Sequence, residues 1–310
     1  MTDHVTTTHG LAPASLTPAA ARSASAVAPT RRRRRQRGAS NPVVNVLLIV
    51  GALLWLIPVY WMVNSALQPE RNLLSNPPHL LPDTPTIANF QGVLTDSSFW
   101  TAMGTSLVAA FLTVTVTTAC SLLAALALAR FGFLGRRTLI VAILVVQMIP
   151  AEALFISQYR MLDGWGLLNS VGGLSLLYIG GVMPFVVWMM RGFVGGIPEE
   201  LEQAAMVDGC SRTQAFVKVT LPLLAPGLVS TSVFAFLHSW NEYTLALVML
   251  SRDTSVTLPL WLQSFQQGLR GSDWGGVMAG STLIALPVMI IFAFVQNKMT
   301  SGMVSGAVKG

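Results

Sequence analysis

Long apolar blocks constrain this chain more than any other feature. Six stretches are mostly apolar over about 20 residues or more, which is the length that a helix needs to cross a bilayer. Charged residues make up only 10% of the sequence, whereas average globular chains carry about 25%. The short alternating segments that mark transmembrane β-strands are not seen. The sequence therefore predicts an all-α membrane protein with six transmembrane helices.

The blocks alternate with shorter polar segments along the chain. They run 43–63, 102–129, 138–156, 171–190, 224–250 and 276–295. Prolines interrupt several of them, and membrane helices tolerate proline because neighbours and water can satisfy the freed backbone groups. We expect one membrane domain, residues 41–310, preceded by a tail of residues 1–40.

Basic residues predict the orientation, because Lys and Arg concentrate in cytoplasmic loops. If the N-terminus is inside and all six blocks cross, 15 of the 19 Lys and Arg lie on the inside. The outside segments hold Arg71, Arg160, Arg252 and Arg270. Both termini are therefore expected in the cytoplasm.

The tail of residues 1–40 is rich in Ala, Ser, Thr and Pro and contains the run RRRRRQR from Arg31 to Arg37. Its apolar content is too low to form a core, so we expect it to be disordered. A basic run can bind nucleic acid. Directly before a membrane span, however, it is more simply a topology anchor against anionic lipid headgroups. We expect contact with lipid and none with nucleic acid.

The sequence lacks the residues that several kinds of chemistry require. The sequence has no G-x-x-x-x-G-K-[ST] motif, so the chain cannot bind ATP through a P-loop of its own. It has no H-E-x-x-H and no cluster of Cys and His for zinc. Ser239 beside His238 is the nearest match to a nucleophile with its base, but adjacent residues on a helix do not face each other. We expect neither catalysis nor a bound cofactor.

The loop of residues 191–223 is the most structured polar segment. Pro198 suits a first helical turn, and Glu199, Glu200 and Glu202 favour a helix N-terminus. Gly209 is placed to end that helix. Ser211 to Gln214 reads as a capping box that opens a second helix, which Pro222 is expected to end. The loop is either a docking site for another protein or an amphipathic hairpin on the membrane surface.

The same loop resembles a known family. The stretch QAAMVDG, nine further residues and VTLP are similar to the E-A-A-x-x-x-G-x9-I-x-L-P motif of ABC importer membrane subunits. The wider stretch IPEELEQAAMVDGCSRTQAFVKVTLPLLAPG resembles the carbohydrate importers, and among them the maltose permease G-type subunit. NPPHLLPDTPTIANF, SWNEYTLALVML and SGMVSGAVKG are similar to that family's first outside loop, fifth span and cytoplasmic tail.

The resemblance implies a type I ABC importer permease in the cytoplasmic (inner) membrane of a bacterium. It implies a second permease subunit, two copies of an ATPase that binds ATP and Mg, and an extracellular solute-binding lipoprotein that delivers a sugar. Residues 198–222 would couple the spans to the ATPase. The coupling residues that it implies are Glu199, Glu202, Gln203, Ala204, Ala205, Asp208, Gly209, Leu221 and Pro222.

One residue departs from the motif. The family's glutamate falls at Gln203, which can form hydrogen bonds but carries no charge. Glu202 lies about 100° round the helix and is no simple substitute. Either the partner ATPase carries a matching change or the contact is looser.

Polar residues inside a span are functional candidates by default. Glu242 lies in such a cluster, and it either contacts the sugar or links helices as a gate or packing residue. Glu152, near the outer end of the third block, is expected to be solvated. The candidate pathway or gate residues are His238, Trp240, Asn241, Glu242 and Tyr243.

Two other functions remain open from the residues alone. A stand-alone secondary transporter would use the cluster around Glu242 for coupling ions, although no internal repeat is visible. A membrane enzyme would need a catalytic constellation that the sequence does not offer.

Overall fold

The computed structural model describes residues 42–251, 255–265 and 273–306, with side chains as far as residue 296. The chain divides into two units, Met1–Leu53 and Leu54–Gly310. The predicted tail with its arginine run lies outside the described residues. So do all side chains of the predicted cytoplasmic tail SGMVSGAVKG.

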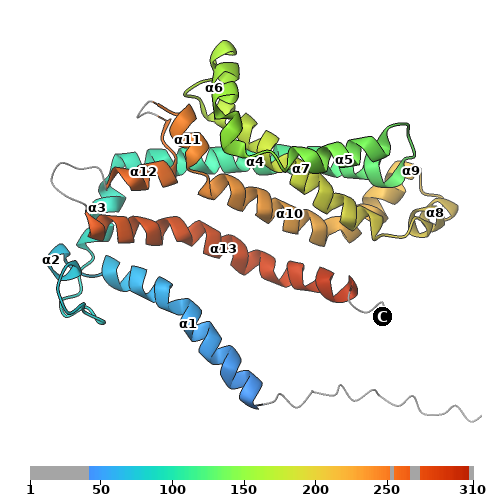
Figure 1. The fold of residues 1–310 in the computed structure, drawn as a ribbon. Coiled ribbons are helices and arrows are strands. Elements are labelled where there is room, and N and C mark those ends of the chain that lie inside the picture. Colours follow the sequence, from blue (N-terminus) through green and yellow to red (C-terminus); the bar gives the residue numbers. More distant parts are fainter. Residues whose placement is uncertain (1–41, 252–254, 266–272, 307–310) are drawn as a thin grey trace, which may run out of the picture. The chain divides into compact units, whose positions relative to one another are not determined.

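Every regular element in the described ranges is a helix (Figure 1). The first half comprises α1 (Pro42–Ala66), α2 (Glu70–Leu73), α3 (Ala88–Thr95), α4 (Ser97–Arg130), α5 (Arg136–Val146), the 3-10 helix η1 (Ala151–Leu154) and α6 (Phe155–Gly164). The second half comprises α7 (Val171–Gly195), α8 (Glu200–Val207), α9 (Arg212–Ala215), the π-helix η2 (Phe216–Thr220), α10 (Leu221–Asn241), α11 (Thr244–Met249), α12 (Leu258–Ser264) and α13 (Trp274–Gly306).

Five helical segments are long and apolar enough to cross a membrane. They are Pro42–Ala66, Ser97–Arg130, Val171–Gly195, Arg212–Asn241 and Trp274–Gln296. A bent pair of helices makes a sixth if it counts as one span. The predicted membrane fold is therefore confirmed, and four of the predicted blocks lie inside α1, α4, α7 and α13.

The third predicted block, 138–156, is not one straight helix. The chain leaves the helix after Val146, and the segment Ala151–Gly164 continues at 96° to α5. Pro150 causes the break, because a proline pushes the residue before it away from helical angles. Pro150 itself has an extended ψ of 127°. The prediction of one continuous helix over these residues was wrong.

The fifth predicted block, 224–250, ends early. Helix α10 stops at Asn241, Glu242 takes an extended conformation with ψ 124°, and α11 begins at Thr244. The Glu242 carboxylate accepts hydrogen bonds from the backbone N–H groups of Leu245 and Ala246. It thereby satisfies donors that a new helix leaves unpaired. Apolar composition alone did not reveal this stop.

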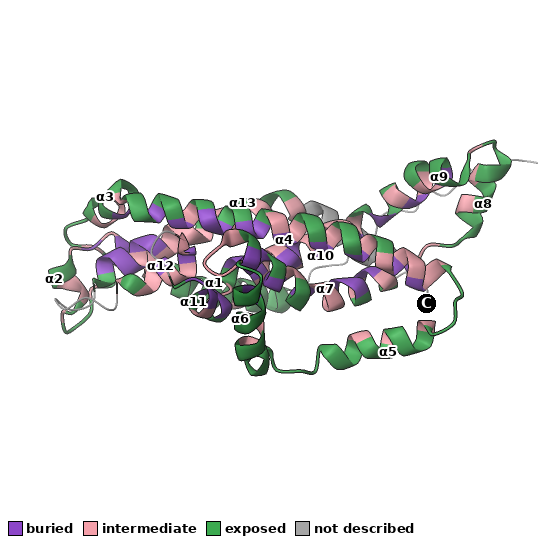
Figure 2. Ribbon diagram, turned by 90° about the horizontal axis from the view of Figure 1, so that it is seen from above, coloured by how far each residue is buried: buried purple, intermediate pink, exposed green. Residues whose placement is uncertain are grey.

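Small and hydroxyl-bearing residues line the contacts among α4, α7 and α10. Thr113, Thr117 and Ser121 of α4 are each 0% exposed, and the Thr118 hydroxyl lies 3.1 Å from that of Ser232 on α10. Small residues let membrane helices approach closely. Figure 2 shows buried faces along α4, α7 and α10, whereas α5 has no buried residue. These three helices form the centre of the larger unit.

The start of α4 is joined to α12 by one polar cluster. The Asp96 carboxylate accepts from the Ser98 backbone N–H at 2.8 Å and from the Ser98 hydroxyl at 2.6 Å. Trp261 Nε1 of α12 donates to the Ser98 hydroxyl at 2.8 Å. Burial raises the pKa of Asp96, but the hydrogen bonds from Ser98 and Trp261 together outweigh it, and the pKa is lowered overall.

Asp96→Ala should destabilise the protein by about 0.5–2 kcal/mol, the usual cost of losing an N-cap. The detergent-solubilised protein should unfold at a lower temperature than Asp163→Ala, which removes an exposed aspartate elsewhere. Because the folded state lowers the pKa, this stabilisation is present above the unfolded pKa and is lost as pH falls through the folded value. Equal melting of the two variants would contradict the capping role.

Candidate functional site

The polar loop folds into the predicted helical hairpin. Gly209 has φ +92° and follows the last residues of α8. The N–H of Gly209 donates to the carbonyl of Met206 at 3.1 Å, and that of Cys210 to Ala205 at 3.0 Å. This is the Schellman arrangement, in which a left-handed residue closes the helix. The prediction that α8 ends here is confirmed.

The second helix begins as predicted but does not end as predicted. Ser211 and Gln214 form both hydrogen bonds of the capping box. Pro222, however, does not stop the helix, which continues from Arg212 to Asn241 as one span of 30 residues. The π-helical turn Phe216–Thr220 lies directly before Pro222. A π turn bonds each N–H one residue further back than an α turn, and it accommodates a residue that has no N–H.

Arg130, at the end of α4, gathers the loop around its guanidinium. Nη2 donates to the carbonyl of Ile197 at 2.9 Å. Nη1 lies 3.2 Å from a carboxylate oxygen of Glu199, and Nη2 lies 3.5 Å from one of Glu202. The Arg130 side chain is only 11% exposed. In the sequence, Arg130 stands out only as a basic residue of a predicted inside segment, and the signal for this role was its position at the last turn of a span.

Glu202 has a second partner inside the chain. The hydroxyl of Thr220, a fully buried residue of η2, donates to its carboxylate at 2.7 Å. Glu202 therefore joins α8 to α4 through Arg130 and to the long span through Thr220. Two of the predicted coupling acids, Glu199 and Glu202, thus face their own protein.

None of the remaining predicted coupling residues is buried. Gln203, Ala204, Asp208, Gly209 and Pro222 are exposed, and Ala205 and Leu221 are half-buried.

Helix α8 has no buried residue, and Val207 is 87% exposed. Gln203 and Val207 share one face, because residues four apart are neighbours on a helix. No part of the described chain buries this face of α8.

Three of the predicted gate residues make contacts that link or pack helices. The Glu242 carboxylate accepts from the Tyr178 hydroxyl of α7 at 2.9 Å, in addition to its two bonds to the α11 backbone. Trp240 is 1% exposed and stacks on Phe236 at 5.2 Å. The Tyr243 hydroxyl donates to Gln263. These contacts support the linking role for Glu242 and place Trp240 in the core.

His238 and Asn241 line different cavities. Asn241 is exposed, donates to the Leu237 carbonyl at 2.9 Å, and lines a cavity of about 440 Å³ with Trp240. His238 lies edge-on to the Tyr178 ring, 6.5 Å between centroids. With Glu242 it lines a larger cavity of about 790 Å³, which Glu152 also lines. The structure therefore does not gather the five gate residues into one site.

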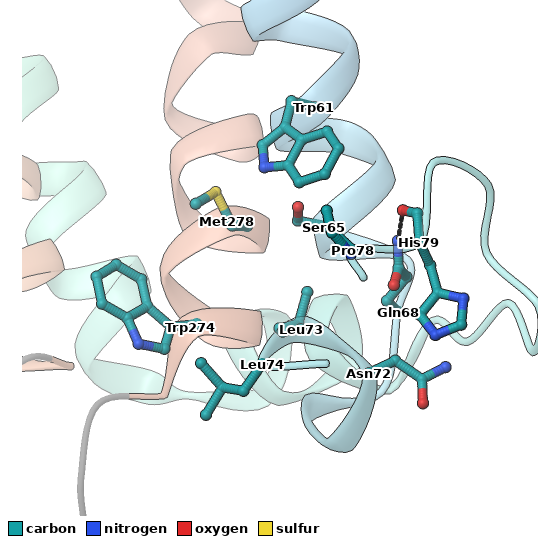
Figure 3. Close-up of a pocket in the computed structure, with 10 residues that line it drawn as sticks. All are labelled: Trp61, Ser65, Gln68, Asn72, Leu73, Leu74, Pro78, His79, Trp274 and Met278. Atoms are coloured by element: carbon teal, nitrogen blue, oxygen red, sulfur yellow. Dashed lines mark hydrogen bonds between the residues drawn. The ribbon is translucent and has the colours of Figure 1, made fainter. Parts of the chain in front are cut away.

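A further pocket, of about 240 Å³, lies against the end of α1 and the start of α13 (Figure 3). Trp61 and Trp274 line it. The side-chain amides of Asn64 and Gln68 donate to the carbonyl of His79 at 3.3 and 3.2 Å. These bonds fasten the predicted first outside loop to the end of α1.

Comparison with known proteins identifies the family. Residues 118–304 match the model of the family described as binding-protein-dependent transport system inner membrane component. The diacetylchitobiose uptake system permease protein DasC of Streptomyces coelicolor is 43% identical over 268 residues, which cover 86% of this chain and 96% of DasC. The trehalose transport system permease protein SugB of Mycobacterium tuberculosis is 32% identical over 264 residues, covering 85% of this chain and 95% of SugB.

A solved structure shows the same fold. It is a bacterial ABC transporter involved in the import of the acidic polysaccharide alginate, with a TM-score of 0.71 and 24% identity, and the match covers 83% of this chain and 95% of that chain. The match of the family model spans more than half of the sequence. The chain therefore belongs to the family of binding-protein-dependent transport system inner membrane components, and it is a multi-pass permease subunit of an ABC importer rather than an enzyme.

Proposed function

We propose that this chain is one of two membrane subunits of an ATP-driven importer for a sugar or oligosaccharide. The observation that carries the proposal is the 43% identity along almost the whole of a diacetylchitobiose permease. A trehalose permease matches over nearly the same range. A solute-binding lipoprotein delivers the sugar from outside, and the second permease supplies the other half of the pathway. The charge distribution favours both termini in the cytoplasm.

Two copies of a partner ATPase supply the energy, with ATP and Mg bound by those copies. Helix α8 is the docking element on this chain. Its support is the exposed face of Gln203 and Val207, which nothing in the described part of the chain covers. The neutral Gln203 gives no charge to a docking contact. Glu199 and Glu202 do not replace that charge, because Arg130 holds both.

In this proposal the contacts around Arg130 transmit the movement of the ATPase subunits to the membrane helices. The Arg130 guanidinium connects α8 to α4. The hydrogen bond between Thr220 and Glu202 connects α8 to the span Arg212–Asn241. Because the helix is continuous from Arg212 to Asn241, a push on the hairpin moves that span directly. Such a rigid connection couples two elements that each have two positions.

Replacing Arg130 tests whether its contacts transmit the movement of the hairpin to the membrane helices. Arg130→Gln removes a hydrogen bond to the Ile197 carbonyl and two ion pairs with carboxylates, and a hydrogen bond that involves a charged group contributes about 1.5–3 kcal/mol. Glu199 is 59% exposed and adds less, since exposed ion pairs are weak. We expect sugar uptake by the reconstituted importer to fall at least tenfold while the subunits stay assembled. Arg137→Gln, at an exposed arginine nearby, should transport normally. Normal uptake with Arg130→Gln would exclude this route.

Replacing Val207 tests docking. Val207→Asp places a charge on an 87% exposed position, so the fold should be unaffected. The ATPase should no longer co-purify with the membrane subunits, because burying an unpaired carboxylate at an interface is costly. Leu134→Asp, at a fully exposed apolar residue in the loop after α4, is the matched control. If the ATPase is retained by both variants, α8 is not its docking helix.

Uptake measurements test the substrate class. Proteoliposomes with the complete importer should accumulate at least one of labelled diacetylchitobiose, trehalose and maltose, and only with ATP on the ATPase side. Accumulation that follows an ion gradient and ignores ATP would instead establish the secondary transporter. Accumulation of none of the three, with a loaded binding protein present, would refute the sugar assignment.

A further inference from the structure

Every charged side chain of α4 and α5 lies in or beside the segment of residues 131–137, which we call the α4–α5 turn. Between Asp96 and Glu152 the sequence contains no acid, and its only basic residues are Arg130, Arg136 and Arg137. Arg130 is engaged by the polar loop, as described above. The other two arginines begin α5, and no function has yet been assigned to them.

Neither of these arginines has an anionic partner in the described part of the chain. The Arg136 guanidinium donates one long hydrogen bond, of 3.5 Å, to the carbonyl of Ala129. Arg137 is exposed and forms no hydrogen bond or ion pair with any described residue. Two neighbouring positive charges therefore remain available to an anion from outside the chain.

The residues before these arginines form an uncovered apolar surface. All of residues 131–135 are exposed. Phe131 lies under the Arg212 guanidinium, with 5.5 Å from its ring centroid to Cζ. Phe133 is 44% exposed and Leu134 is fully exposed. Helix α5, which follows, has no buried residue and is exposed along most of its length (Figure 2). A continuous apolar surface of this kind marks contact with a protein or a membrane.

The length of α5 brings its first residues to the surface of the bilayer. The helix has 11 residues, and at 1.5 Å per residue it is about 17 Å long. This is about half of the hydrocarbon core, which is roughly 30 Å thick. Residues 139–146 are apolar and suit that core. Arg136 and Arg137 then lie at the level of the headgroups, where basic side chains keep their charge out of the hydrocarbon.

Two guanidinium groups beside an apolar loop match the two parts of an anionic phospholipid. Phosphate oxygens accept hydrogen bonds from guanidinium groups in favourable geometry, and anionic lipid attracts basic segments near the membrane surface. Aromatic and leucine side chains enter the boundary between headgroups and acyl chains. A soluble phosphate would satisfy the two arginines but would leave Phe133 and Leu134 in water.

We propose that the α4–α5 turn binds an anionic phospholipid, with Arg136 and Arg137 on the headgroup and Phe133 and Leu134 among the acyl chains. The bound lipid holds the C-terminal end of α4, from which Arg130 contacts the polar loop. The inference needs only that the chain spans a membrane, and it does not depend on the sugar that is carried.

Quenching of a fluorescent label by brominated lipids tests the site. This chain carries Thr138→Cys, at an exposed residue next to the arginines, together with Cys120→Ser and Cys210→Ser, and the cysteine is labelled with bimane. The complete membrane complex is placed in nanodiscs of phosphatidylcholine with a minority of phosphatidylglycerol, and the bromine is on one lipid or the other. Phosphatidylglycerol should quench about tenfold more per molecule, because each arginine favours anionic lipid severalfold.

Substitutions in the turn identify the binding residues. Arg136→Gln with Arg137→Gln should make the two lipids quench equally per molecule, whereas lysine at both positions should keep most of the preference, because it keeps the charge. Arg71→Gln with Arg160→Gln, at two exposed arginines elsewhere, is the matched control and should keep the full preference. Leu134→Ser should lower the quenching by both lipids, because the apolar contact does not depend on headgroup charge.

Several results would overturn the proposal. They are equal quenching by the two lipids in the chain with both arginines, and an unchanged preference in the double glutamine variant. Abolition of the preference by inorganic phosphate would assign the arginines to a soluble anion instead. Loss of the ATPase alone from the purified double glutamine variant would assign them to a protein contact. If that variant does not assemble, Arg137→Gln alone should lower the preference about fivefold, and an unchanged preference there also rejects the site.

Discussion

The structure depends on one constraint, which is that a backbone inside a bilayer must satisfy its own hydrogen bonds. Three positions at which the described chain departs from a regular helix meet this constraint in three different ways. At Glu242 a carboxylate accepts from the N–H groups that start α11. At Pro222 a π turn precedes the residue that has no N–H. At Pro150 the chain turns by 96° beside a cavity that can hold water. The irregular positions are thus where the polar chemistry gathers.

Arg130 has a similar unifying role at the C-terminal end of α4. One nearly buried guanidinium contacts a carbonyl and two carboxylates from a loop about 70 residues further along the chain. Glu199 and Glu202 of the loop make this internal contact, and Gln203 and Val207 are left exposed. The charge missing at Gln203 therefore does not reflect a shortage of acids. Those acids are already engaged in holding the hairpin to α4.

Much of this could be predicted from the sequence, because local rules govern it. Apolar length predicted the spans, and glycine and serine chemistry predicted the end of α8 and the capping box of α9. The breaks at Pro150 and Glu242 and the continuity through Pro222 could not be predicted, since proline within a membrane helix has several outcomes. Nor could the contacts of Arg130 and Tyr178, which join segments far apart in sequence. Composition gives the number of spans, and three-dimensional contacts decide where each one bends.

Helix α5 is apolar, yet none of its residues is buried. A helix of that kind obtains its surroundings from lipid or from another subunit. Because α5 leads into the bend that forms one wall of the large cavity, the environment of that wall is incomplete in the single chain. A copy of this subunit made without other subunits would therefore leave α5 uncovered by protein, and quality control could recognise that apolar helix.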